Sequence, residues 1–212
     1  MKVTENLRGL LLPAPTPFGR SGEIDFPALK ANIDKWSSAG VSGFVLLGST
    51  GERVHLDDRE YLQTIETARA AVPTDQAFIA GAGQQSVIGT ISEVKRAARA
   101  GAEAVLVITP YFYRSAITQE TLVSFYTAVA DEAPVPVLLY SMPPLTGIKI
   151  EPDTVARLSE HANIIGAKVT LAPVMTKHRP KKAAIPLRPT RPLSTTARAM
   201  STKGVTKANA IA

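Results

Sequence analysis

The sequence contains no cysteine among its 212 residues. Disulfide scaffolds, thiolate zinc sites and cysteine nucleophiles all require that residue, so the chain excludes them. Histidine is scarce as well, since only His55, His161 and His178 occur, far apart and without the short spacing of metal ligands. We therefore expect these histidines at the surface or at helix ends, and we expect no bound metal and no other cofactor.

Long apolar runs are also missing. No stretch approaches the roughly 20 apolar residues that cross a bilayer. Residues 1–8 lack both the apolar core of a secretory signal and the Arg- and Ser-rich, acid-poor composition of a transit peptide. Hydrophobic residues make up 45% of the chain and charged residues 20%, which is ordinary for a globular protein. These features predict a protein without a membrane partner, located in the cytoplasm, with a mitochondrial location as the alternative.

Acidic residues are absent from one end of the chain. Residues 171–212 contain nine Lys or Arg and five Pro but no acid and no aromatic residue, which leaves 15 basic against 18 acidic residues in positions 1–170. Such a segment buries too little apolar surface to fold, so we predict a domain over residues 1–170 and a disordered basic tail over 171–212. A nucleic-acid partner for this tail is an alternative that the lack of aromatic residues does not favour.

Six short apolar runs are bounded by Gly, Pro or polar turns, and they predict buried strands. They span residues 9–15, 43–47, 77–82, 104–109, 135–140 and 164–168. Between them apolar residues recur at helical spacing, as at Leu62, Ile65 and Ala68. We expect helix starts at Asp25, Ser86, Thr118 and Glu151-Pro152, and helix ends at Gly40 and Gly101. The strand starts lie 27 to 34 residues apart, which is the repeat of successive βα units in a parallel sheet.

An open doubly wound sheet and a (β/α)8 barrel both show this repeat. The first strand runs into Pro13–Pro17 instead of a glycine-rich turn, and Gly81-Ala82-Gly83 lacks the third glycine of a dinucleotide-binding motif. The chemistry of the strand ends favours the barrel. We therefore predict an α/β fold of the (β/α)8 type, incomplete, with about six βα units.

In a parallel barrel the active site lies at the carboxyl ends of the strands. The second predicted strand ends in Gly48–Glu52, where Ser49 and Thr50 stand between two glycines. Backbone amides and hydroxyl groups could converge there on a small anion such as a carboxylate. The alternative is a tight turn that merely tolerates unusual backbone dihedrals.

Two further strand ends carry reactive side chains. Tyr140 ends the fifth predicted strand, where its hydroxyl could move a proton, or where it is simply a core tyrosine. Lys168 ends the sixth, and burial would favour the neutral amine that attacks a carbonyl, unless the side chain reaches out to solvent. Together, the three strand ends suit a 2-oxo acid: an amine for C2, a cradle for the carboxylate and a phenol for proton transfer.

These motifs resemble the dihydrodipicolinate synthase and N-acetylneuraminate lyase family of class I aldolases, over about residues 7–170. The matching segments are Pro15–Phe18, Gly48–Glu52, Thr109–Tyr111, Tyr140–Gly147 and Ile165–Lys168. The resemblance implies a (β/α)8 barrel that forms a homo-oligomer, with Lys168 as the Schiff-base lysine, Tyr140 as the acid–base group, and Ser49 and Thr50 as the residues that bind the pyruvyl carboxylate. It also implies a tyrosine that reaches a neighbouring subunit from the loop after strand four, for which Tyr113 is favoured over Tyr111.

Smaller features bear on the reaction. Synthases of this family usually carry an arginine where this chain has Leu145. The pair Tyr140-Ser141 and the segment Tyr111–Arg114 look closer to aldolases of 4-hydroxy-2-oxoglutarate and of 2-keto-3-deoxy sugar acids. We predict a Schiff-base lyase that cleaves or condenses such a pyruvate-derived 2-oxo acid, without a metal. The alternatives are a dihydrodipicolinate synthase that uses aspartate semialdehyde, and an inactive truncated paralogue, because strands seven and eight of the family are not recognisable in the sequence.

Overall fold

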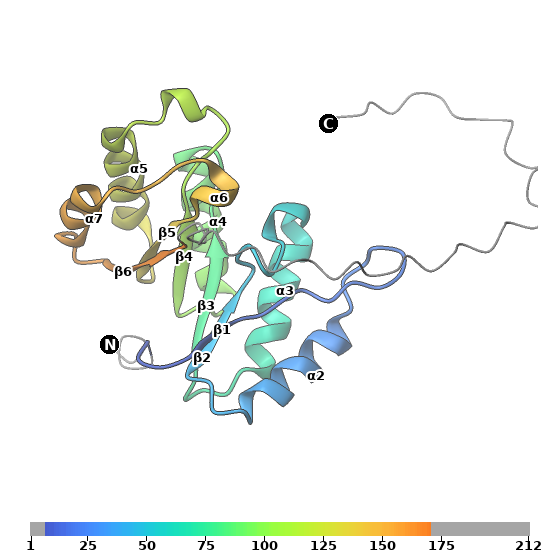
Figure 1. Cartoon of the computed structure of the whole chain (residues 1–212). Helices are drawn as coiled ribbons and strands as arrows, with labels where there is room; N and C mark the ends of the chain where they lie inside the picture. The colour runs from blue at the N-terminus through green and yellow to red at the C-terminus, as the bar shows by residue number, and fades with distance from the viewer. Residues whose placement is uncertain (1–6, 171–212) are drawn as a thin grey trace, which may run out of the picture. The chain divides into compact units, whose positions relative to one another are not determined.

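The computed structural model describes residues 7–170, and its six strands form one parallel sheet in the order β1-β2-β3-β4-β5-β6 (Figure 1). The strands are β1 (Leu11–Pro13), β2 (Gly43–Leu46), β3 (Ala77–Ala82), β4 (Ala104–Ile108), β5 (Val137–Ser141) and β6 (Ile164–Val169). The sheet curls into a half-barrel, which confirms the predicted α/β class and the six βα-type strands. Within the described range, β1 and β6 each have a neighbouring strand on one side only.

Helices link the strands and cover the outer face of the sheet. They are α2 (Phe26–Ser37), α3 (Asp58–Ala71), α4 (Val87–Arg99), α5 (Gln119–Glu132), α6 (Pro143–Thr146) and α7 (Pro152–Ser159), with the 3-10 turns η1 (Arg53–His55) and η2 (Arg114–Ala116). Figure 1 shows α2 and α3 side by side near the first strands, and α5 and α7 together near the last. Among the helices of residues 7–170, none is long and apolar enough to span a membrane.

Most of the predicted helix starts are confirmed by their capping bonds. The side chains of Asp25, Ser86 and Thr118 each accept a hydrogen bond from the backbone amide three residues further on, at 2.9 to 3.1 Å. At α7, Pro152 occupies the first helical position as expected, but the side chain of Glu151 makes no capping bond. Three caps therefore satisfy amides that the first helical turn leaves unpaired.

The strand bounds differ slightly from the prediction. β5 begins two residues later than expected, at Val137, because Pro134 and Pro136 have no amide hydrogen to donate to a ladder. β5 and β6 each continue one residue past Tyr140 and Lys168. The predicted tail, residues 171–212, lies outside the described residues.

The core has two layers because successive strand residues face opposite sides of the sheet. The larger layer lies between sheet and helices and contains Phe44, Phe78 and the buried tyrosines Tyr61 and Tyr126. Burial raises the pKa of both phenols, and each donates to a strand carbonyl, at 2.9 and 3.0 Å. The smaller layer lines the inner face of the half-barrel and consists of Val45, Ile79, Ala104, Leu106 and Tyr140. Tyr140 thus faces the interior of the half-barrel.

Candidate active site

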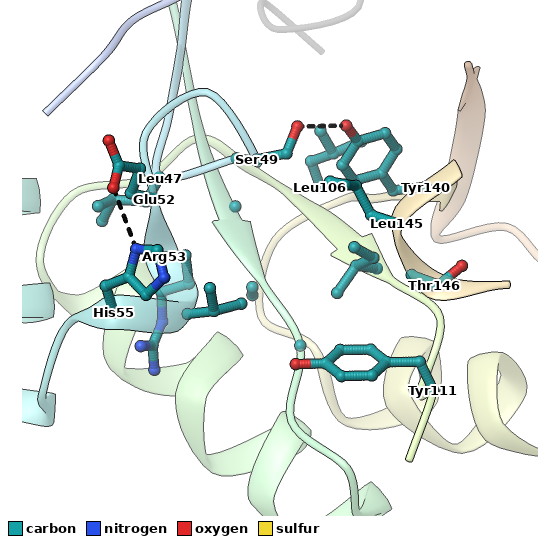
Figure 2. A pocket seen from close by; sticks show the side chains of 16 residues that line it. Leu47, Ser49, Glu52, Arg53, His55, Leu106, Tyr111, Tyr140, Leu145 and Thr146 are labelled. Atoms are coloured by element: carbon teal, nitrogen blue, oxygen red, sulfur yellow. Dashed lines mark hydrogen bonds and ion pairs between the residues drawn. The ribbon is translucent and has the colours of Figure 1, made fainter. Parts of the chain in front are cut away.

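Tyr140 lies next to two other predicted site residues, Lys168 and Ser49. The register of β5 and β6 pairs Tyr140 with Lys168, so both side chains lie on the same face of the sheet. The Lys168 Nζ lies 4.6 Å from the centroid of the Tyr140 ring. The Tyr140 hydroxyl lies 2.8 Å from Ser49 Oγ, as Figure 2 shows. Three residues separated by up to 119 positions therefore meet at one end of the sheet.

The contact between Ser49 and Tyr140 has the geometry of a proton relay. Either hydroxyl can donate to the other, and a distance of 2.8 Å is normal for an O–H···O hydrogen bond. Tyr140 is only 2% exposed, whereas Ser49 and Lys168 are half-buried. A proton on the buried phenol can therefore reach the cavity through the Ser49 hydroxyl.

The segment between β2 and η1 is a tight turn with strained ends. Leu47 and Glu52, which flank the two glycines, have φ values of 58° and 55°, a left-handed conformation that costs roughly 1–2 kcal/mol for each such residue. Two internal backbone hydrogen bonds of 3.1 and 3.3 Å close the turn. Among the described residues, no hydrogen bond to the amides of Ser49 and Thr50 is found. The segment is therefore a strained turn, and the binding of an anion by its amides stays a prediction.

Glycine is required where this turn meets its neighbours. A Cβ at Gly51 would lie 2.6 Å from the Leu47 amide nitrogen, and a Cβ at Gly81 would lie 2.1 Å from the Leu47 carbonyl oxygen. The Thr16 hydroxyl donates to the Gly51 carbonyl at 2.7 Å, so the Pro15–Phe18 segment supports the turn from β1. The backbone packing between β1, β2 and β3 thus sets the position of Ser49.

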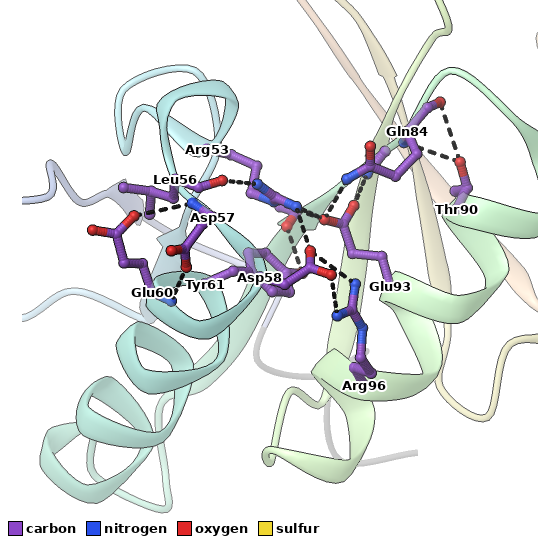
Figure 3. A network of polar contacts seen from close by, with 12 residues as sticks. Arg53, Leu56, Asp57, Asp58, Glu60, Tyr61, Gln84, Thr90, Glu93 and Arg96 are labelled. Carbon is purple, nitrogen blue, oxygen red and sulfur yellow. Dashed lines mark hydrogen bonds and ion pairs between the residues drawn. The ribbon is translucent and has the colours of Figure 1, made fainter.

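A buried carboxylate ties this turn to the end of β3 (Figure 3). Glu93 lies on α4 and is fully buried, and its Oε1 accepts from Arg53 Nε at 2.7 Å, from Arg53 Nη2 and from Gln84 Nε2 at 3.0 Å. Its Oε2 accepts from the Gly83 amide at 2.7 Å. Buried charges persist when they are paired and hydrogen-bonded in this way, so Glu93 acts as a clamp between two strand-end loops.

Arg53 extends the same network toward α3. Its Nη1 donates to the Leu56 carbonyl at 3.0 Å, and its guanidinium carbon lies 4.3 Å from the centroid of the Tyr61 ring. Asp58 lies at the edge of the network, where it pairs with Arg96 at 2.7 Å. The hydrogen bond from Arg96 lowers the pKa of the Asp58 carboxyl.

A cavity of about 340 Å³ opens beside the Ser49–Tyr140 contact, within the usual size range for small-molecule sites. Its walls are formed by Leu47, Gly48, Ser49, Glu52, Arg53, Val54, His55, Gly81, Ala82, Gly83, Leu106, Ile108, Tyr111, Tyr140, Leu145 and Thr146. Thr50 is exposed and does not line this cavity. Lys168, whose Nζ lies over the Tyr140 ring, is not among the lining residues either. The structure thus brings together Ser49, Tyr140 and Lys168, with Thr50 next to them in the turn.

The loop after β4 presents its aromatic residues in two directions. Tyr111 lines the cavity, whereas Tyr113 is 73% exposed and packs edge to face on Phe112, which is 70% exposed, with 5.0 Å between the ring centroids. Within one chain, Tyr113 therefore takes no part in the cavity. Its expected contribution to a neighbouring subunit stays a prediction.

The ion pair of Arg53 and Glu93 was not predicted from the sequence. The partners are 40 positions apart, and no local motif joins them. One signal was present: Glu93 lies on the same face of α4 as the buried residues Thr90, Val94 and Ala97. An acid on a buried helical stripe requires a cation or hydrogen-bond donors.

Comparison with known proteins gives consistent matches. A profile of the dihydrodipicolinate synthetase family matches residues 6–186. The 4-hydroxy-tetrahydrodipicolinate synthase of Xanthomonas axonopodis pv. citri is 40% identical over 163 residues, which cover 77% of this chain and 53% of that protein. The L-threo-3-deoxy-hexylosonate aldolase of Aspergillus niger is 37% identical over 201 residues, which cover 92% of this chain and 60% of that protein.

Solved structures agree with these matches. The prophage protein YagE from E. coli K12, of the dihydrodipicolinic acid synthase family and in complex with pyruvate, matches with a TM-score of 0.73 at 34% identity, over 77% of this chain and 54% of that one. The chain spans about half the length of the curated relatives it matches first. The family profile, the sequence identities and the fold all lead to one conclusion: this chain belongs to the dihydrodipicolinate synthetase family.

Proposed function

We propose that this chain is a class I aldolase that forms a Schiff base between Lys168 and a pyruvate-derived 2-oxo acid. The observation that carries the proposal is the grouping at the strand ends, with 2.8 Å between Ser49 Oγ and the Tyr140 hydroxyl and 4.6 Å between Lys168 Nζ and the Tyr140 ring. An amine, a proton relay and free amide donors are the groups that this chemistry requires.

The proposed reaction proceeds through an iminium ion. The neutral amine of Lys168 attacks the C2 carbonyl, and water leaves as the C=N bond forms. Removal of the proton from the C4 hydroxyl lets the C3–C4 bond break and an aldehyde depart. The electron pair of the broken C3–C4 bond then forms the C2–C3 double bond of the enamine. The enamine takes a proton at C3, and water hydrolyses the iminium to release pyruvate and the free lysine. Condensation is the reverse sequence.

The neighbouring groups have distinct roles in this scheme. Tyr140 passes protons through Ser49 to the oxygen atoms of the substrate. The amides of Ser49 and Thr50, with the Thr50 hydroxyl, bind the carboxylate at C1. The iminium nitrogen is the electron sink, so the scheme needs no metal ion.

The substrate proposed is 4-hydroxy-2-oxoglutarate or a 2-keto-3-deoxy sugar acid. Leu145, which is 63% exposed at the cavity, stands where related synthases carry an arginine for a second carboxylate. The similarity to the Aspergillus niger aldolase supports this choice, whereas the similarity to the Xanthomonas synthase supports the alternative of pyruvate and aspartate semialdehyde. An inactive form is the other alternative, supported by the single-sided pairing of β1 and β6 in the described part of the chain.

Assembly into a homo-oligomer is proposed from the loop after β4. Phe112 and Tyr113 together present two exposed aromatic rings, which are enriched where proteins associate. A second subunit that covers them would place Tyr113 close to a neighbouring site. A cytoplasmic location stays a prediction.

Reductive trapping tests the proposed function directly. The full chain is incubated with pyruvate and sodium borohydride, and the modified lysine is identified by peptide mass spectrometry. We expect a reduced pyruvate adduct on Lys168 and none on Lys149, an exposed lysine that pairs with Glu151 at 2.7 Å. Lys168→Arg should abolish the adduct. A folded sample, judged by circular dichroism, with an unmodified Lys168 would contradict the proposal.

A further inference from the structure

Glu52 and His55 form a polar pair on the wall of the cavity. Glu52 Oε2 lies 3.0 Å from His55 Nδ1, and their side chains are 48% and 67% exposed. Both line the cavity that Ser49 and Tyr140 also line. Figure 2 shows this pair on one side of the cavity, with Tyr140 and Leu145 on the other.

The hydrogen bond between them determines what this wall offers to a ligand. A neutral imidazole that donates its Nδ1–H to a carboxylate presents its Nε2 as an acceptor. The second carboxylate oxygen of Glu52 is an acceptor as well. The wall formed by Glu52 and His55 is therefore suited to ligand hydroxyl groups, which donate.

The charges of the lining residues lead to the same conclusion. Among the cavity-lining residues within the described range 7–170, only Arg53 carries a permanent positive charge, and its guanidinium is already bonded to Glu93 and to the Leu56 carbonyl. A second carboxylate on the substrate would face Glu52 without a free cation, and like charges placed together cost several kcal/mol. A neutral aldehyde that carries hydroxyl groups meets no such penalty.

We propose that Glu52 and His55 bind the hydroxyl groups on the aldehyde half of the substrate and determine its class. The favoured substrate is then a 2-keto-3-deoxy sugar acid, which releases a neutral hydroxyaldehyde, and not 4-hydroxy-2-oxoglutarate, which releases a carboxylate-bearing aldehyde. This assignment rests on the proposed Schiff-base chemistry, and it adds two specificity-determining residues to it.

The test compares capture of three compounds by Lys168 in the full chain. Pyruvate, 2-keto-3-deoxygluconate and 4-hydroxy-2-oxoglutarate are each incubated with the protein, and borohydride reduces the imine that forms on Lys168. For each compound, the Lys168 adducts of the intact compound and of the pyruvate released from it are summed. We expect capture of the sugar acid to exceed that of 4-hydroxy-2-oxoglutarate by about tenfold or more. His55→Phe and Glu52→Gln should each reduce that ratio by about fivefold or more, because each removes an acceptor for a substrate hydroxyl.

A matched control and an independent readout separate this inference from the proposed function. His161→Phe should leave the ratio unchanged, since His161 pairs with Asp131 at 3.0 Å and does not line the cavity. If pyruvate is captured but the ratio is unaffected by both cavity variants, or favours 4-hydroxy-2-oxoglutarate, the inference is wrong and the Schiff-base proposal stands. If none of the three compounds is captured, the Schiff-base proposal fails.

Non-covalent binding of the substrates to the Lys168→Arg variant, which cannot form an imine, then tests the inference independently of the Schiff-base proposal. The His55 ring protons are assigned in the NMR spectrum by comparison with the same protein carrying His55→Phe. They should shift on addition of 2-keto-3-deoxygluconate and not on addition of 4-hydroxy-2-oxoglutarate. An unchanged His55 signal with the sugar acid would overturn the assignment.

Discussion

Removing the buried carboxylate of Glu93 is the sharpest test of how the strand-end loops are held. Glu93→Ala deletes the acceptor of two Arg53 donors, of Gln84 and of the Gly83 amide, and it leaves the guanidinium, which is 12% exposed, without its partner. Breaking a buried pair by removing one partner costs about 3–5 kcal/mol. Since domains of this size are stable by about 5–15 kcal/mol, the variant should lose a large part of its stability.

Urea unfolding of the full chain, followed by circular dichroism, measures this loss. With an m-value of about 2 kcal/mol/M, the midpoint should fall by about 2 M. The matched control is Glu132→Ala, which breaks an exposed pair with Lys95 at 2.5 Å and should cost less than about 1 kcal/mol. The two variants remove the same side chain and differ in its burial.

A double variant separates the charge from the packing. Arg53→Met with Glu93→Leu removes both charges and keeps most of the volume, so its cost should be clearly smaller than that of Glu93→Ala alone. The reasoning fails if Glu93→Ala costs less than about 1 kcal/mol. It also fails if the destabilisation of the double variant equals the sum of those of its two single variants, because the ion pair then does not clamp the loops.

Three other outcomes follow from particular contacts. Tyr61→Phe leaves a buried strand carbonyl without its donor and should lower the free energy of unfolding by about 1–3 kcal/mol in urea; no change would mean that the bond is not formed. Arg96 lowers the pKa of Asp58, so this pair stabilises the fold above the ordinary aspartate value of about 3.9 and the effect is lost as the pH falls through the folded-state pKa. In thermal melts, Asp58→Asn should therefore have a lower melting temperature than the wild type at neutral pH. On acidification, the melting temperature of the variant should fall less than that of the wild type, and an equal fall in both proteins would refute this. Tyr140→Phe should slow pyruvate capture by Lys168 by about 10²-fold with an unchanged urea midpoint, and an unchanged rate would exclude Tyr140 from proton transfer.

Local patterns in the sequence were sufficient for the strand repeat and for most helix starts. The apolar runs that begin at Gly43 and at Ala77 predict buried strands because each run is bounded by turn residues. This prediction does not require knowledge of the strands with which they pair. The caps at Ser86 and Thr118 depend on amides only three residues away, so they too can be inferred locally. The order of the strands did not follow from the repeat, because an open doubly wound sheet shows the same repeat with another strand order. The chemistry of the strand ends favoured the barrel, and the structure has the sequential order of a barrel.

Contacts between distant residues could be determined only by the tertiary structure. The sequence placed Ser49, Tyr140 and Lys168 at strand ends. The hydrogen bond between Ser49 and Tyr140 depends on backbone packing, and the pairing of Tyr140 with Lys168 depends on the register of the sheet. The same holds for the pairing of Arg53 with Glu93, which depends on the rotation of α4 about its axis. Periodicity specifies which face of an element is buried, but it does not specify which residue of another element that face meets. The sequence therefore identified the chemical groups, and the packing of the elements decided which of them act together.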